Sequence, residues 1–192
     1  MYNVRMNKFG IVLIFLVFIG GCGSAVKYIN PAANFSYIKK IAVLPFNNLS
    51  DDRYAGEKVR NTLIVDLMSR GAFEVVEQGE VTKVLSVIFR EAGVEEGKAV
   101  PVDTETLKLI GEKLGVQAVI LGSVDEYSGA GGGNIVSIGA RMLDTGSGII
   151  LWQTKATETG RSVWRKLVGM EEVDKSELTR KAVKSALDTL LL

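Results

Sequence analysis

The order in which extended and helical patterns alternate along this chain constrains its fold more than any other feature of the sequence. From residue 38 onward, short apolar runs alternate with segments whose apolar residues recur at three- and four-residue steps. The first pattern predicts strands and the second predicts amphipathic helices. The resulting order is βαβααβββα. We therefore expect an α/β domain with a mixed sheet of about five strands and helices packed on it.

The expected elements are bounded by residues that begin or end helices. Asp51 or Asp52, Asp103, and Asp174 or Ser176 are placed to cap helices, and Gly71, Gly93 and Gly115 are placed to end them. The predicted strands are 39–46, 72–77, 117–127, 135–144 and 149–159, and the predicted helices are 54–70, 81–93, 103–115 and 174–192.

The last three strands are separated by Gly-rich turns, which predicts antiparallel hairpins that pair in sequence order. Within 135–144 the residues alternate between two faces. Val136, Ile138, Ala140 and Met142 share one face, and Ser137, Gly139 and Arg141 share the other. This alternation predicts a sheet that helices cover on one side.

The N-terminus has the pattern of an export signal. Arg5 and Lys8 precede the apolar stretch 9–19, whose 11 residues would rise only about 16 Å as a helix, too short to cross a bilayer. Ile19, Gly20 and Gly21 followed by Cys22 resemble the bacterial lipobox. We therefore expect residues 1–21 to be a signal peptide, Cys22 to be acylated, and 22–37 to form a tether without regular structure. The membrane attachment would be the acylated Cys22.

Composition limits the chemistry that the chain can perform. It has no His and a single Cys, so Ser-His-Asp and Cys-His nucleophile systems are excluded, as are zinc sites that depend on His or Cys ligands. The 23 Lys and Arg nearly balance the 22 Asp and Glu, so nucleic acid is not an expected partner. We predict no catalytic residue, metal, cofactor or small-molecule substrate.

Five segments resemble the CsgG-like family of bacterial lipoproteins: KKIAVLPFNNLSDD, LMSRGAFEVVEQGEVTKVL, AGV, ETLKLIGEKLGVQAVILGSVDEY and ARMLDTGSGIILW. That family includes curli secretion channels, holdfast anchors and LpoB-type activators, and its domain is similar to the N-terminal domain of TolB. The resemblance implies that residues 38–192 form a protein-binding module on the outer membrane, facing the periplasm, in envelope or surface-structure assembly such as that of curli. Its partners would be other envelope proteins or further copies of itself. The alternative is a subunit of a CsgG-type oligomeric secretion channel.

The loop 46–52 is the predicted place for partner binding. Asn47, Asn48 and Ser50 follow the first strand and precede a helix, a position that often carries function. The competing interpretation is that Asn47 and Asn48 only stabilise their own turn. Trp152 and Trp164 could serve as ligand platforms, but Trp152 alternates with Ile150 and Leu151 in a predicted strand, which favours packing in the core or at a sheet edge.

Overall fold

The structure is a computed structural model that describes residues 24–91, 102–129, 133–160 and 173–190. It is an α/β fold, as the sequence predicts. The strands are β1 (Ser24–Ile29), β2 (Lys40–Val43), β3 (Asn47–Asn48), β4 (Glu74–Val75), β5 (Ala118–Gly129), β6 (Asn134–Asp144) and β7 (Ile150–Thr159). The helices are α2 (Ala55–Arg70), α3 (Gln78–Glu91), α4 (Thr104–Leu114) and α6 (Lys175–Leu187).

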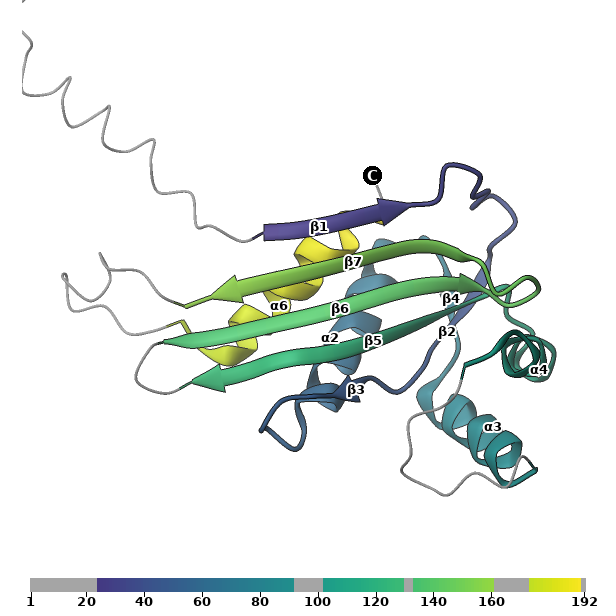
Figure 1. The fold of residues 1–192 in the computed structure, drawn as a ribbon, viewed down its shortest axis with the longest axis horizontal. Helices are drawn as coiled ribbons and strands as arrows, with labels where there is room; N and C mark the ends of the chain where they lie inside the picture. Colours follow the sequence, from purple (N-terminus) through teal and green to yellow (C-terminus); the bar gives the residue numbers. More distant parts are fainter. Residues whose placement is uncertain (1–23, 92–101, 130–132, 161–172, 191–192) are drawn as a thin grey trace, which may run out of the picture.

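The strands form one mixed sheet in the order β1-β7-β6-β5-β2-β4, and β3 pairs with β5 beyond the end of β2 (Figure 1). The hairpins β5–β6 and β6–β7 are antiparallel, which confirms the predicted pairing in sequence order. β2 is parallel to both β4 and β5. The sequence did not indicate β1 or β3; β1 makes the sheet one strand wider, whereas β3 continues the position of β2 along β5.

One face of the sheet is covered by α2 and α6, which lie behind the strands in Figure 1. The alternating residues of β6 predicted to face the helices are buried there: Val136, Ile138, Ala140 and Met142. Trp152 is also fully buried on this face, and its Nε1 donates a hydrogen bond to Oγ1 of Thr189 at 2.9 Å. Core packing of Trp152 is therefore confirmed.

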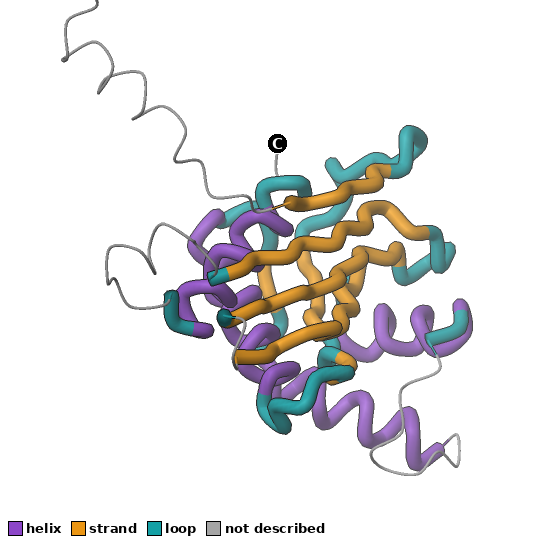
Figure 2. Tube along the Cα trace, turned by 60° about the vertical axis from the view of Figure 1, so that its left-hand side comes forward, coloured by secondary structure: helices purple, strands orange, loops and turns teal. Residues whose placement is uncertain are grey.

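The opposite face is covered at one end only, by α3 and α4, which the tube view shows set apart from the other two helices (Figure 2). The expectation of one covered side is wrong at this end. The reason is visible in β2, where Ile41, Ala42 and Val43 are all buried although they alternate between faces. A parallel strand buried on both faces has a continuous apolar run, so it needs helices on both sides.

Residues 24–29 are a correction to the predicted tether. They form β1, which pairs with β7 from Ser24 opposite Thr157 to Ile29 opposite Trp152. The side chains of Ala25 to Ile29 are exposed, so backbone hydrogen bonds rather than a buried apolar face hold the strand. That is why the sequence carries no hydrophobic pattern for it.

Most predicted helix boundaries are confirmed. The side chain of Asp103 accepts a hydrogen bond from the Thr106 N–H at 2.7 Å, and that of Asp174 accepts one from the Ser176 N–H at 3.1 Å. Gly71 and Gly115 end their helices with φ of 64° and 65°. The cap of α2 differs, because Tyr54 holds the N-cap position and Asp52 binds the Tyr54 N–H from two residues earlier. Gly93 lies outside the described residues.

Among the residues that the structure describes, no helix has both the length and the apolar character needed to cross a bilayer.

Candidate functional site

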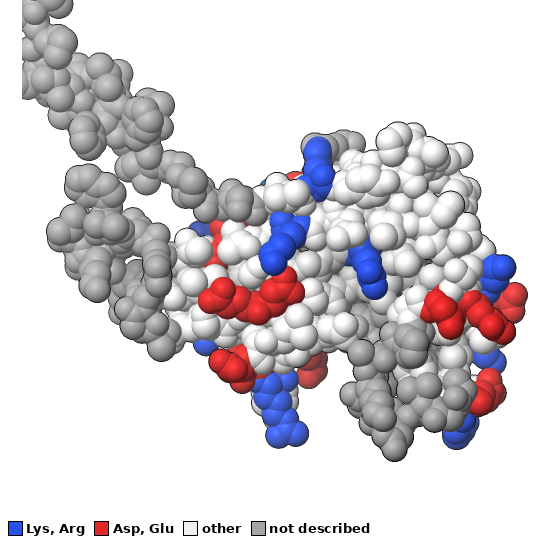
Figure 3. Space-filling model, viewed as in Figure 1, with Lys and Arg blue, Asp and Glu red and all other residues white. Residues whose placement is uncertain are grey.

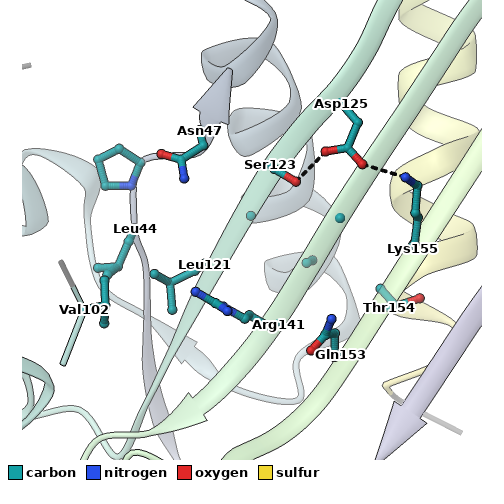
Figure 4. Close-up of a pocket in the computed structure, with 14 residues that line it drawn as sticks. Leu44, Asn47, Val102, Leu121, Ser123, Asp125, Arg141, Gln153, Thr154 and Lys155 are labelled. Carbon is teal, nitrogen blue, oxygen red and sulfur yellow. Dashed lines mark hydrogen bonds and ion pairs between the residues drawn. The ribbon is translucent and has the colours of Figure 1, made fainter. Parts of the chain in front are cut away.

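A groove of about 380 Å³ lies on the part of the sheet that α3 and α4 leave open (Figure 4). Strands β5, β6 and β7 form its floor, and the segment that leads from β2 into β3 forms one wall. Figure 3 shows this face of the molecule as mostly uncharged, with a few scattered basic side chains and some acidic ones. The lining residues used below are Leu44, Asn47, Val102, Leu121, Ser123, Asp125, Gly139, Arg141, Gln153 and Lys155.

Strand register brings the floor residues together from distant parts of the sequence. Arg141 of β6 lies opposite Leu121 of β5 and opposite Gln153 of β7. Two residues earlier in β6, Gly139 lies opposite Ser123 and Lys155. A Cβ on Gly139 would lie 3.0 Å from Oγ of Ser123. The glycine therefore leaves no side chain in the middle of the groove floor.

One end of the groove is polar and internally paired. Nζ of Lys155 lies 2.8 Å from Oδ2 of Asp125, and Oγ of Ser123 donates to Oδ1 of Asp125 at 2.7 Å. Partial burial raises the pKa of Asp125, but the bonds from Lys155 and Ser123 outweigh burial and lower its pKa below the ordinary value. Asp125 is therefore an anionic, satisfied group at neutral pH.

The other end is apolar, and it adjoins polar groups that have no partner among the residues that the structure describes. Leu44, Val102 and Leu121 approach one another beside the Arg141 side chain in Figure 4. Arg141 and Gln153 are exposed, and neither side chain makes a hydrogen bond or an ion pair within the described part of the chain. A guanidinium beside an apolar patch can bind a carboxylate and an apolar side chain of one extended segment.

Asn47 lies at the rim of the groove. It belongs to β3, which pairs in parallel with β5 so that Asn47 lies opposite Ser123. The ring of the preceding Phe46 is buried over Gly122, where an added Cβ would overlap the ring. This packing fixes the rim, while the exposed Asn47 side chain makes no hydrogen bond to any described residue.

Asn48 and Ser50 are arranged differently. Oδ1 of Asn48 accepts hydrogen bonds from the N–H of Ser50 at 3.1 Å and from its Oγ at 2.7 Å. Nδ2 of Asn48 donates to the carbonyl oxygen of Asp52 at 2.7 Å. The geometry of these two residues favours turn stabilisation, whereas that of Asn47 leaves its amide available for a partner.

Arg141, Gln153 and Lys155 line the groove, but no motif in the sequence marks them as site residues. The signal that could have found them is the row of polar residues at the outward positions of strands 135–144 and 149–159. Ile19, Gly20, Gly21, Cys22 and Trp164 lie outside the described residues. Within the described ranges, no group of three or more His, Cys, Asp or Glu side chains is placed to hold a metal ion.

Fold and groove together define an α/β domain whose sheet is open over three strands. No family model and no curated protein matches the chain. Among solved structures, a PelC dodecamer from Paraburkholderia phytofirmans is similar, with a TM-score of 0.58 and 17% identity over 87% of this chain and 98% of that chain.

Two other structures also resemble the chain. Hypothetical protein CT253 from Chlamydia trachomatis has a TM-score of 0.52 and 11% identity over 79% of this chain and 95% of that chain. The LpoB C-terminal domain from Salmonella enterica has a TM-score of 0.48 and 18% identity over 62% of this chain and 81% of that chain. The TM-scores of PelC and CT253 support a shared fold. The TM-score of the LpoB domain is too low to support one.

Proposed function

We propose that this protein is a lipid-anchored, non-catalytic binding module of the bacterial envelope, which receives a segment of another envelope protein in the groove. The observation that carries the proposal is the groove itself, where Arg141, Gln153 and Asn47 lie beside an apolar end and have no side-chain partner among the described residues. The lipobox ending in Cys22 supports anchoring, and the CsgG-like sequence resemblance supports a place on the outer membrane with the domain in the periplasm.

The groove chemistry indicates what the bound segment carries. Arg141 binds an acidic side chain or a chain terminus, and Leu44, Val102 and Leu121 receive an apolar side chain next to it. Asn47 can bond to the backbone of an extended segment. The occupant is therefore an extended acidic and apolar stretch of polypeptide.

Photo-crosslinking in the native envelope tests this proposal. A benzophenone amino acid at position 153 is expected to capture one defined protein, and Arg141→Glu is expected to reduce that capture at least tenfold. The matched control is position 180, because Arg180 is exposed on α6 on the other face of the sheet. Equal capture from positions 153 and 180, or capture unaffected by Arg141→Glu, would contradict the proposal.

Two single substitutions distinguish the role of Asn47 from that of Asn48. Asn48→Ala removes the hydrogen bonds to Ser50 and Asp52, so it is expected to lower the melting temperature. Asn47→Ala is expected to leave the melting temperature unchanged and to weaken crosslinking from position 153. The reverse pattern would assign recognition to Asn48 and a structural role to Asn47.

Binding to further copies of the same chain is the second form that this function can take. The similar PelC structure is a dodecamer, so the fold is compatible with self-assembly. The mass of the detergent-solubilised protein decides between a monomer and an oligomer. The alternative of a CsgG-type channel subunit is less well supported, because β5 and β6 are central strands of the domain sheet and are not free to leave it.

A further inference from the structure

The edge strand β1 begins close to the predicted anchor. Only Gly23 separates Cys22 from Ser24, where β1 starts. An extended chain spans at most about 3.6 Å per residue, so the Cα atoms of Cys22 and Ser24 lie within about 7 Å of each other. The lipid headgroup layer is itself about 5 to 8 Å thick on each side of the hydrocarbon core. An acylated Cys22 therefore holds the start of β1 at headgroup level.

Three of the ten large apolar side chains that are exposed among the described residues lie on this six-residue strand. Val26 is 73% exposed, Tyr28 is 50% exposed and Ile29 is 38% exposed. Val26 and Tyr28 lie opposite Lys155 and Gln153, on the open face of the sheet, while Ile29 lies opposite the buried Trp152. Apolar groups thus flank both sides of the edge, and tyrosine is a side chain that favours the interface between membrane and water.

The charge distribution around β1 suits an anionic lipid surface. From Ser24 to Tyr37, β1 and its connection carry one Lys residue and no Asp or Glu. That residue, Lys27, is exposed within the strand itself. Lys27 is therefore available to anionic headgroups, and this stretch contributes no carboxylate that would repel them.

The backbone of β1 is also open on its outer side. β1 is the edge of the described sheet and pairs with β7 alone, so the outward N–H and C=O groups of the strand have no partner within the described residues. An exposed, regular edge invites pairing with other chains. Hydrated headgroups satisfy these groups and keep other chains away.

We propose that β1 is the membrane-contacting edge of the domain, with Val26, Tyr28 and Ile29 entering the lipid interface, so that the domain lies against the bilayer instead of on a tether. This inference rests on the proposed acylation of Cys22. Strand spacing of about 4.8 Å then places β7, β6 and β5 at about 5, 10 and 14 Å from β1. An occupant of the groove is therefore a segment that runs within about 15 Å of the membrane surface.

Labels on single cysteines test the contact in the full-length acylated protein. Acylation occupies the thiol of Cys22, which is the only natural cysteine, so Val26→Cys or Tyr28→Cys can be labelled selectively. The protein is reconstituted into vesicles of phosphatidylethanolamine and phosphatidylglycerol and labelled with an environment-sensitive fluorophore. Val65→Cys on α2 is the matched control, because Val65 is 67% exposed on the helix-covered side.

The expected result is a blue-shifted emission at positions 26 and 28 that nitroxide-labelled lipid quenches at least threefold more than at position 65. Equal quenching at all three positions, in protein whose mass shows the acylated Cys22, would overturn the inference and leave the anchor intact. A mature protein without acyl chains would instead overturn the proposed anchoring. A label at position 26 that is blue-shifted but not quenched by lipid, and that crosslinks to another copy, would assign the edge to a second protomer.

A longer linker between Cys22 and β1 provides a second, independent variant. Twelve Gly and Ser residues inserted between Gly23 and Ser24 leave β1 unchanged but extend the reach of the anchor. The lipid quenching at position 26 is expected to fall several-fold in this variant. Unchanged quenching would show that the short spacing does not hold the strand at the membrane, and the inference would fail.

Discussion

Arg60 is a buried cation whose bonds go to the backbone. Its Nε and Nη2 donate to the carbonyl oxygen of Val43 at 3.1 and 2.6 Å, and Nη1 lies 3.4 Å from Oε1 of Gln78. Burial lowers its pKa, and the nearby charges of Glu77 and Glu57 oppose this effect. Arg60 thus satisfies the last carbonyl of β2, at the point where the chain turns toward the groove.

Arg60→Met is expected to lower the free energy of unfolding by about 1–3 kcal/mol, because the Val43 carbonyl is left buried without its donors. Urea denaturation of residues 24–192 measures the effect. Arg180→Met, an exposed arginine on α6, is the control and is expected to change stability by less than about 0.5 kcal/mol. Equal midpoints for the two variants would contradict this role of Arg60.

Tyr37 fastens the connection between β1 and β2 to the β6–β7 turn. Its hydroxyl donates to Oδ2 of Asp144 at 2.5 Å, and Asp144 also accepts bonds from Ser147. Burial, then the hydrogen bond to Asp144 and the charge of Asp144, raise the pKa of Tyr37 to about 12. Burial raises the pKa of Asp144, but the bonds from Ser147 and Tyr37 outweigh it and lower that pKa overall.

These shifts predict a pH dependence with two limits. The raised pKa of Tyr37 stabilises the fold below pH 10, and this stabilisation is lost as the pH rises toward 12. The lowered pKa of Asp144 stabilises the fold above about pH 3.9, and this stabilisation is lost as the pH falls through the folded-state pKa. Tyr37→Phe is therefore expected to cost about 1 kcal/mol or less near neutral pH, because solvent screens an exposed pair.

Denaturation at several pH values measures this difference, which is expected to shrink at both limits. An absorbance titration should also show that the tyrosine that ionises last in the wild type is missing from the variant. A stability difference that stays constant from pH 3 to pH 12 would refute the role of the Tyr37–Asp144 bond.

At the scale of elements, the contact between Phe46 and Gly122 joins the groove rim to β5. Gly122→Ala is expected to destabilise the fold by about 1–3 kcal/mol, since a Cβ would overlap the buried Phe46 ring. Combining it with Phe46→Leu should recover part of the loss. Gly146→Ala is the control, because its nearest contact would be an ordinary 3.4 Å to Asp144. Thermal melting of the four proteins measures the effects, and equal losses for Gly122→Ala and Gly146→Ala would contradict the overlap.

The elements that could be predicted from the sequence are those with local signals. Asp103 and Asp174 cap their helices within three residues, and Gly71 and Gly115 end theirs, so short-range patterns suffice. The groove could not be predicted, because Arg141 meets Leu121 and Gln153 only once the register of three strands is known. Likewise, the sequence placed Asn48 and Ser50 in the right loop but could not show that they bond to each other.

At the scale of the whole molecule, the sheet is enclosed by helices on one face and half covered on the other, and the open half extends to the edge strand β1. Residues 24–29, which precede the predicted domain, therefore belong to the sheet. Ala33 and Phe35 of the following connection pack against the main core, so residues 24–37 contribute to the folded domain. The division between tether and domain at residue 38 is tested directly by truncation.

A chain that starts at residue 38 loses β1 and its connection, so β7 becomes the edge of the described sheet with six residue pairings removed. It also loses the hydrogen bond from Oγ1 of Thr154 to the Val26 carbonyl, the bond between Tyr37 and Asp144, and the packing of Phe35.

We expect residues 38–192 to be less stable than residues 24–192 by about 2 kcal/mol or more, and to associate more readily, because the exposed β7 edge can pair with another chain. Urea denaturation and size-exclusion chromatography of the two chains measure these effects, and a chain starting at residue 30 separates the contribution of β1 from that of its connection. If all three chains unfold at the same urea concentration as monomers, β1 contributes nothing to stability and residues 22–37 act as the tether that the sequence suggests.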